Sequence, residues 1–248
     1  PLPSRRNGSG KRRHLWDQCL TDVGIANSTD PADQIRFILI GDSVMRLQEE
    51  ALRGFVTGST AKNVKISRIS MFGGISRTLS NVTADLRNIR QGNPDERRIV
   101  VFNSALHDVD RLCSSEMRSS RKKHFPGVSD DDLVCVEFYE ELLGRLVDVV
   151  AKYPAELKVF RTANAAWPKY GNFGFAWPTT KVQPFSRSPN FVAKINEIAY
   201  DVIPKRGQGG IHIIDGYWIS LPRPDHTEVG SINTIGKHMV HPGVEVIS

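Results

Sequence analysis

The chain has 248 residues, 40% of them hydrophobic and 24% charged, which is the composition of a soluble globular protein with one sizeable core. No apolar run approaches the roughly 20 residues of a membrane-spanning helix, and no signal-peptide core is present. The net charge of +6 suggests nucleic-acid binding, but five of the 33 basic residues lie in residues 1–13, which contain no acid. The remaining 28 basic residues are balanced by 27 acidic ones, so nucleic acid is not an expected partner.

Residues 1–13 are rich in Gly, Ser and Arg, which predicts a flexible basic tail, and residues 14–248 are expected to form a single domain. The chain starts at Pro1 rather than Met, so we expect a mature or truncated form, attached to a membrane only through a removed anchor. Three Asn-X-Ser/Thr sequons favour a secretory route; they lie at Asn7, Asn27 and Asn81. The three cysteines allow one disulfide, and three free thiols fit equally well.

Hydrophobic patterns predict strands and helices that alternate along the chain. Apolar or alternating runs predict five strands, at 35–41, 64–70, 98–102, 156–161 and 211–215. Apolar residues at helical spacing predict helices at 44–57, 80–91, 131–153 and 191–203. Asp42 or Ser43 can cap the first of these helices, and Ser80 is expected to cap the second. We therefore predict an α/β fold, a three-layer α/β/α sandwich with a mostly parallel central sheet.

Two segments follow neither pattern. Residues 109–130 are polar and basic, which predicts a surface insertion. Residues 167–185 hold six aromatic side chains among prolines and glycines, which predicts a long irregular loop. Trp167 and Trp177 in this loop are candidates for stacking on a sugar ring; a structural cluster that pins the loop to the body fits equally well.

Polar residues and glycines follow three of the predicted strands. Asp42 and Ser43 follow the first strand, a Gly-Gly pair follows the second, and Asn103 and His107 follow the third. The carboxyl ends of parallel strands are where open α/β folds bind their ligands. Acyl transfer needs a nucleophilic hydroxyl, backbone and amide donors for the oxyanion, and an imidazole base. These strand ends, together with two histidines near the C-terminus, supply all of them, although Ser43 taken alone could be a simple helix cap.

The order Ser–Gly–Asn–His resembles the SGNH (GDSL-type) hydrolase superfamily, and within it the PC-esterase branch. That branch includes trichome-birefringence-like polysaccharide O-acetyltransferases and sialic-acid O-acetyltransferases. The run Gly41-Asp-Ser-Val-Met-Arg-Leu-Gln looks like the branch's Gly-Asp-Ser-x-x-Arg-x-Gln, and Val100-Val-Phe-Asn-Ser-Ala-Leu-His-Asp is similar to its third block. The resemblance implies an SGNH-like fold. It also implies that Ser43 is the nucleophile, in the block that contains Asp42. The oxyanion donors would be Asn103, Gly74 (or Gly73) and the Ser43 N–H. Arg46 and His107 would be substrate-binding residues.

The final block departs from the family's Asp-x-x-His pattern. Neither His238 nor His241 has an aspartate three residues before it. His241, which is followed by proline, is the first choice for the catalytic base, and His238 is the alternate. The missing acid has three readings: a Ser–His dyad, an acid supplied by Asp215 or Asp225, or a silent site retained for binding.

The predicted function is serine-dependent acyl transfer on O-acyl groups of carbohydrate, through an acyl-enzyme at Ser43. The protein would be a glycan O-acetyltransferase or O-acetylesterase of the Golgi lumen or the extracellular space. The alternative is a catalytically silent domain that binds a glycan or another partner. The expected partner is a glycan or acylated carbohydrate, with the acyl donor left open. No metal is expected, because no Cys/His spacing predicts zinc, and no cofactor is expected either.

Overall fold

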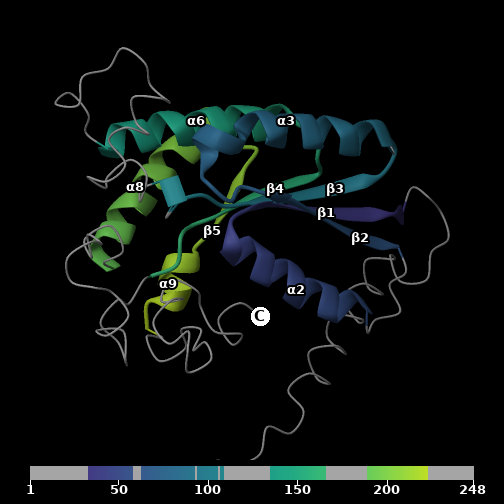
Figure 1. Cartoon of the computed structure of the whole chain (residues 1–248), viewed down its shortest axis with the longest axis horizontal. Helices are drawn as coiled ribbons and strands as arrows, with labels where there is room; N and C mark the ends of the chain where they lie inside the picture. The colour runs from purple at the N-terminus through teal and green to yellow at the C-terminus, as the bar shows by residue number, and fades with distance from the viewer. Residues whose placement is uncertain are drawn as a thin grey trace, which may run out of the picture.

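The computed structural model describes residues 33–57, 63–92, 94–105, 107–108, 135–165 and 189–222. Strands and helices alternate along these ranges (Figure 1). The strands are β1 (Ile35–Gly41), β2 (Val64–Ser70), β3 (Arg97–Phe102), β4 (Leu157–Arg161) and β5 (His212–Ile214). The helices are α2 (Ser43–Thr57), α3 (Ile75–Gly92), α6 (Cys135–Lys152), α8 (Pro189–Arg206) and α9 (Gly216–Ser220). The predicted tail, the insertion at 109–130 and the aromatic loop at 167–185 lie outside the described residues.

The five strands form one sheet in the order β2-β1-β3-β4-β5, and every pair of neighbours is parallel. Helices α3 and α6 cover one face of the sheet, while α2 and α9 lie on the other (Figure 1). Helix α8 packs beside α6. The prediction of a three-layer α/β/α sandwich with a parallel central sheet is therefore confirmed.

The strand order reverses between β1 and β3. From β1 the chain moves outward to β2, and it then returns across β1 to form β3 on the other side. In open α/β sheets this topological switch point, at the carboxyl ends of the two strands, is where ligands bind. The two segments that begin there are the Asp42–Ser43 turn and the loop that starts at Asn103.

The most deeply buried core residues include several on β1, β3 and β4, the three inner strands of the sheet. Ile38 and Ile40 of β1 are fully buried, as are Phe102 and Phe160 at the ends of β3 and β4. The rings of Phe102 and Phe160 meet edge to face with centroids 5.1 Å apart. Strands covered by helices on both faces need apolar residues throughout, which is the near-continuous apolar pattern that the sequence shows for β1.

Several predicted elements need correction. The helix expected at 80–91 begins at Ile75, so Ser80 lies inside it and is not its cap. The helix expected to end at 203 continues to Arg206 and includes Pro204 near its last turn. Strand β5 is shorter than predicted, and the one-turn helix α9 after it was not predicted. The first error has a physical cause, because the acceptor for the first N–H of α3 comes from a residue far away in the sequence.

Gly41 provides the first testable point of this fold. A Cβ at this position would lie 1.8 Å from Oδ1 of Asn103 and 2.9 Å from the Cβ of Met45. Gly41→Ala should therefore displace Asn103 or the first turn of α2, and we expect the free energy of unfolding to fall by about 1–3 kcal/mol, the usual effect of overpacking.

Gly54 is the matched control, since a Cβ there would meet nothing within 4 Å. Gly54→Ala, inside α2, should stabilise the protein by roughly 0.5–1 kcal/mol through helix propensity. Urea unfolding followed by circular dichroism measures both changes. Equal stability of the two variants would contradict the close packing of Asn103 on Gly41.

Candidate active site

Ser43 occupies the first position of α2, directly after the turn that ends β1. Asp42 caps this helix: its Oδ1 accepts the N–H of Val44 at 2.9 Å, and its carbonyl accepts the N–H of Arg46 at 3.1 Å. Of the two possible caps, the structure selects Asp42. The Ser43 side chain is half-buried at the N-terminus of the helix, where backbone N–H groups can stabilise negative charge.

Asn103 lies beside this turn. Its N–H donates to the carbonyl of Ile40 at 3.0 Å, which fixes the start of the β3 loop against the end of β1. Its side chain, 4% exposed, extends over Gly41, and Nδ2 donates to Oδ1 of Asp42 in a long hydrogen bond of 3.5 Å. Its buried Oδ1 has no hydrogen-bond partner. The structure thus brings Asn103 into contact with Asp42, the residue that precedes Ser43.

The Gly73–Gly74 pair forms the turn after β2, and both residues have positive φ angles, 116° and 85°. The turn is held to β1 because the N–H of Met71 donates to the carbonyl of Gly41 at 2.7 Å. Within the turn, the N–H of Gly74 donates to the carbonyl of Met71 at 3.0 Å. The Gly74 N–H is therefore already used, whereas the Gly73 N–H has no acceptor among the described residues.

Asp108 joins the second and third loops of this edge. Its carboxylate, 3% exposed, accepts the N–H of Ile75 at 2.7 Å and the hydroxyl of Ser104 at 2.8 Å. The Tyr139 hydroxyl donates to the carbonyl of Ser104 at 3.1 Å, and burial, followed by the charge of Asp108, raises the pKa of Tyr139. A Cβ on Gly74 would lie 2.5 Å from Oδ1 of Asp108. Asp108 therefore caps α3 from a distant loop and requires glycine at position 74.

The two predicted substrate-binding residues that the structure describes lie at different places. His107 is at the carboxyl edge, where its ring meets that of Phe72 at 5.2 Å, edge to face. Phe72 is 72% exposed beside the glycine turn. Arg46 is exposed and forms an ion pair with Glu50 at 2.7 Å, one turn along α2. The side chain of Arg46 is thus engaged with Glu50, and only its backbone N–H bonds to Asp42.

The remaining predicted residues, His238, His241, Trp167 and Trp177, lie outside the described residues. Of the two alternative acids, Asp225 also lies outside them, whereas Asp215 is described.

Asp215 already serves as the cap of α9. Its carboxylate accepts the N–H of Trp218 at 3.0 Å, the hydroxyl of Thr162 at 3.2 Å and the hydroxyl of Tyr200. Burial, followed by the hydrogen bond to Asp215, raises the pKa of Tyr200. Asp215 also follows β5, which is three strands away from β1 in the sheet. These contacts give Asp215 a structural role and make it a poor choice for the triad acid.

Arg161, at the carboxyl end of β4, is a buried charge that the sequence analysis missed. It is 5% exposed, and its guanidinium donates to Oδ1 of Asn164 at 2.5 Å and to the carbonyl of Thr162 at 3.4 Å. Burial lowers its pKa to about 10, although the charge of Asp42 acts in the opposite direction. In a sequence, an arginine at the end of a short strand is normally interpreted as a surface residue. The only sequence signal for a functional role was its position at the carboxyl end of a predicted strand.

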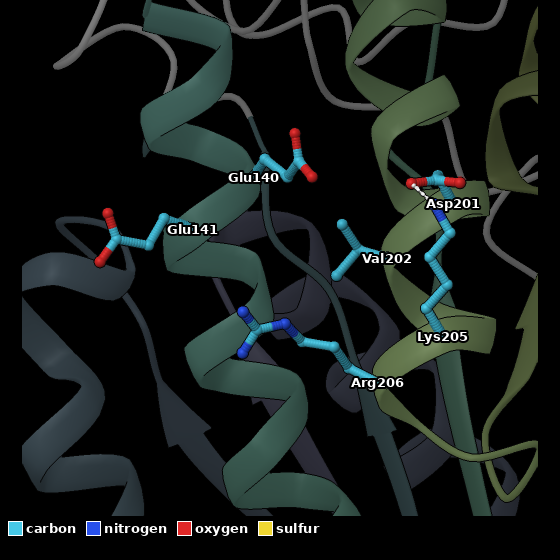
Figure 2. Close-up of a pocket in the computed structure, with 6 residues that line it drawn as sticks. All are labelled: Glu140, Glu141, Asp201, Val202, Lys205 and Arg206. Carbon is cyan, nitrogen blue, oxygen red and sulfur yellow. Dashed lines mark hydrogen bonds and ion pairs between the residues drawn. The ribbon is translucent and has the colours of Figure 1, made fainter.

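A groove of about 310 Å³ lies between α6 and α8 and is separate from this cluster (Figure 2). Its lining contains none of the predicted site residues; it consists of Glu140, Glu141, Asp201, Val202, Lys205 and Arg206. Its charges are mostly paired: Lys205 with Asp201 at 2.6 Å, Arg206 with Asp148 at 2.8 Å, and Glu141 with Arg145. We place the candidate site at the carboxyl edge of the sheet, where the chemistry-bearing residues gather.

Two further observations concern only the described part of the chain. It contains no group of three His, Cys, Asp or Glu side chains arranged to hold a metal ion. None of its helices is both long and apolar enough to cross a membrane.

Comparison with known proteins gives a distant likeness. No protein-family model and no curated protein matches the chain. Among solved structures, it is similar to the salicylyl-acyltransferase SsfX3 from a tetracycline biosynthetic pathway, with 15% identity and a TM-score of 0.45. The similarity covers 89% of this chain and 52% of that one, so the chain spans about half the length of SsfX3. The identity and the TM-score are too low for the activity of SsfX3 to carry over to this chain.

Asp108→Ala tests the link between the two loops. The substitution leaves the buried N–H of Ile75 without an acceptor, and an unsatisfied buried group costs about 1–3 kcal/mol. We expect the free energy of unfolding to fall by at least that amount in a urea titration. The control is Asp95→Ala, at an exposed position, which should change it by no more than about 0.5 kcal/mol. Matching losses in both variants would contradict the role of Asp108.

Proposed function

We propose that the chain is a serine-dependent acyl-transfer enzyme with Ser43 as its nucleophile. One observation carries the proposal: Asp42, which caps α2 and accepts the hydrogen bond of the buried Asn103 amide, directly precedes Ser43 at the helix N-terminus, at the topological switch point. The side chain of Asp42 accepts the N–H of Val44, so Asp42 already fills the capping role that was the alternative for Ser43. The position also supplies helix N–H groups close to the hydroxyl.

In the proposed reaction, a histidine base takes the proton of the Ser43 hydroxyl as the oxygen attacks the acyl carbonyl. His241 is our first choice for the base and His238 the alternate. The tetrahedral intermediate then collapses, and the histidinium returns the proton to the leaving oxygen. In the second half-reaction, the same histidine activates the acceptor: a sugar hydroxyl completes a transfer and water completes a hydrolysis.

The oxyanion would be held by the Ser43 N–H, the Asn103 amide and one N–H of the glycine turn. Gly74 was the expected donor of that turn, but its N–H already bonds to Met71. We therefore propose Gly73 in its place, because its N–H has no acceptor among the described residues and its φ of 116° suits glycine. Asp108 would support this arrangement by tying the turn to the Asn103 loop.

For the substrate we propose O-acyl groups of carbohydrate, as in a glycan O-acetyltransferase or O-acetylesterase of the secretory pathway. Support comes from the Gly-Asp-Ser-x-x-Arg-x-Gln run and the Asn103 block, which resemble the PC-esterase branch of the SGNH superfamily, and from the three sequons. Acetate release and acetyl transfer to a glycan, measured with a labelled acetyl donor, would tell esterase from transferase.

A second candidate function is a catalytically silent domain that binds a glycan or another partner. The absence of an aspartate three residues before either histidine favours it, and so does the engagement of Asp215 in capping α9. Removing the acid of a serine triad lowers the rate by orders of magnitude without abolishing the chemistry. The two candidates therefore differ in whether Ser43 is activated, which can be measured directly.

The test is labelling with a fluorophosphonate probe, followed by intact mass spectrometry. Wild type should be labelled and Ser43→Ala should not. Replacing the true base, in His241→Ala or His238→Ala, should slow labelling by at least about 100-fold, the usual contribution of a general base. Ser70→Ala, at the exposed end of β2, is the matched control and should label like wild type. If the folded wild type takes up no label, the silent binding domain becomes the better account.

A further inference from the structure

Two neighbouring hydrogen-bond donors are buried at the carboxyl end of β4 without enough acceptors. Asn164 is 3% exposed, and its buried Nδ2 has no hydrogen-bond partner in the part of the chain that the structure describes. The guanidinium of Arg161 beside it makes two hydrogen bonds, although it carries five N–H donors. Among the described residues, Arg161 forms no ion pair.

The orientation of the Asn164 amide follows from its neighbour. A guanidinium can only donate, so the oxygen of the amide must face Arg161, as it does at 2.5 Å. The NH₂ group then points away and remains unpaired, and exchanging the two amide atoms would place donors against donors. A buried charge and a buried amide that have more N–H donors than acceptors are costly in a folded protein unless something else supplies oxygen atoms.

The charge of Arg161 is also poorly neutralised. Asp42 is the acid whose charge acts on Arg161, yet the two form no ion pair, and Asp42 already caps α2. Loss of hydration lowers the pKa of Arg161 to about 10, which still leaves it cationic at neutral pH. The guanidinium packs closely on Gly216, where a Cβ would lie 2.8 Å from Cζ of Arg161.

The sheet register places these donors close to the candidate nucleophile. Ile40 pairs with Phe102, and Phe102 pairs with Phe160. One residue further along each strand are Gly41, Asn103 and Arg161, which therefore lie in one row at the carboxyl edge. Neighbouring strands are about 4.8 Å apart, so β4 lies roughly 10 Å from β1 at this edge of the sheet.

We propose that Arg161 and Asn164 form a subsite for an anionic oxygen group of the substrate: the carboxylate of an acidic sugar or the phosphate of an acyl donor. The guanidinium would bind two oxygen atoms side by side, and Nδ2 of Asn164 would bind one of them as well. This subsite rests on the proposed function of Ser43, since it would hold the substrate at the edge of the sheet where that hydroxyl lies.

Isothermal titration calorimetry on the 248-residue chain tests the subsite. Sodium glucuronate should bind saturably, and glucose, its neutral counterpart, should not. Inorganic phosphate is the second arm: tighter binding of phosphate than of glucuronate would assign the subsite to a phosphorylated donor, and the reverse would assign it to an acidic sugar. If neither anion binds saturably to the wild-type protein, the inference is wrong.

The variants locate the binding. Asn164→Asp keeps the shape of the side chain and places a carboxylate against Arg161, so it should fold and should weaken anion binding at least about tenfold. Arg161→Gln should do the same. Arg145→Gln, which removes an exposed arginine on α6, is the control and should bind like wild type. Unchanged affinity in Asn164→Asp would place the anion elsewhere and overturn the inference.

Fluorophosphonate labelling of the same samples separates this inference from the proposed function. Labelled wild type that binds neither anion would leave the acyl-transfer proposal standing and remove the subsite. Anion binding that depends on Asn164 in a protein that takes up no label would do the opposite. Glucuronate should also slow the labelling of Ser43, because the bound sugar and the probe would occupy the same edge of the sheet.

Discussion

The contact of the Asn103 side chain with the backbone of Gly41 is the constraint on which the rest of the site depends. A Cβ at position 41 would lie 1.8 Å from Oδ1 of Asn103, so the amide can cross the end of β1 only because that residue is glycine. The contact brings the amide to the Asp42–Ser43 turn at the place where the strand order reverses. The N–H of Met71, bonded to the carbonyl of Gly41, brings the glycine turn to the same point. Gly41 thus contacts the Asn103 loop and the glycine turn and leads directly into the Asp42–Ser43 turn, so three loops meet at this one residue.

Buried polar groups fix these loops relative to one another. Asp108 ties the start of α3 to the Asn103 loop, and Asp215 ties α9 to the end of β4 through Thr162. Each carboxylate holds backbone N–H groups that would otherwise be unsatisfied at a helix start. Arg161 differs, because its neighbours supply fewer acceptors than it has donors. Among the described residues, this edge of the sheet therefore has two carboxylates with hydrogen-bond partners and one cation with more donors than acceptors.

The sequence predicted those parts of the fold that depend on local patterns. The bounds of β1 and β2 agree with the prediction, since a buried apolar run and a strict alternation are both local signals. The start of α3 was predicted wrongly because its cap, Asp108, lies 33 residues away from Ile75. The burial of Arg161 and the use of the Gly74 N–H by Met71 depend on how strands and turns come together, and no local pattern reports either. The placing of polar residues at strand ends could be predicted; the hydrogen bonds between them could not.

The central claim is that Ser43 becomes acylated, and the most direct measurement is to trap that intermediate. The folded chain is mixed with p-nitrophenyl acetate, quenched with acid within the first turnover, digested and analysed by mass spectrometry. The account predicts one acetyl group on the peptide that contains Ser43, and none on that peptide from Ser43→Ala. A folded protein in which no peptide gains an acetyl group, or in which the acetyl group lies on another residue, would contradict it.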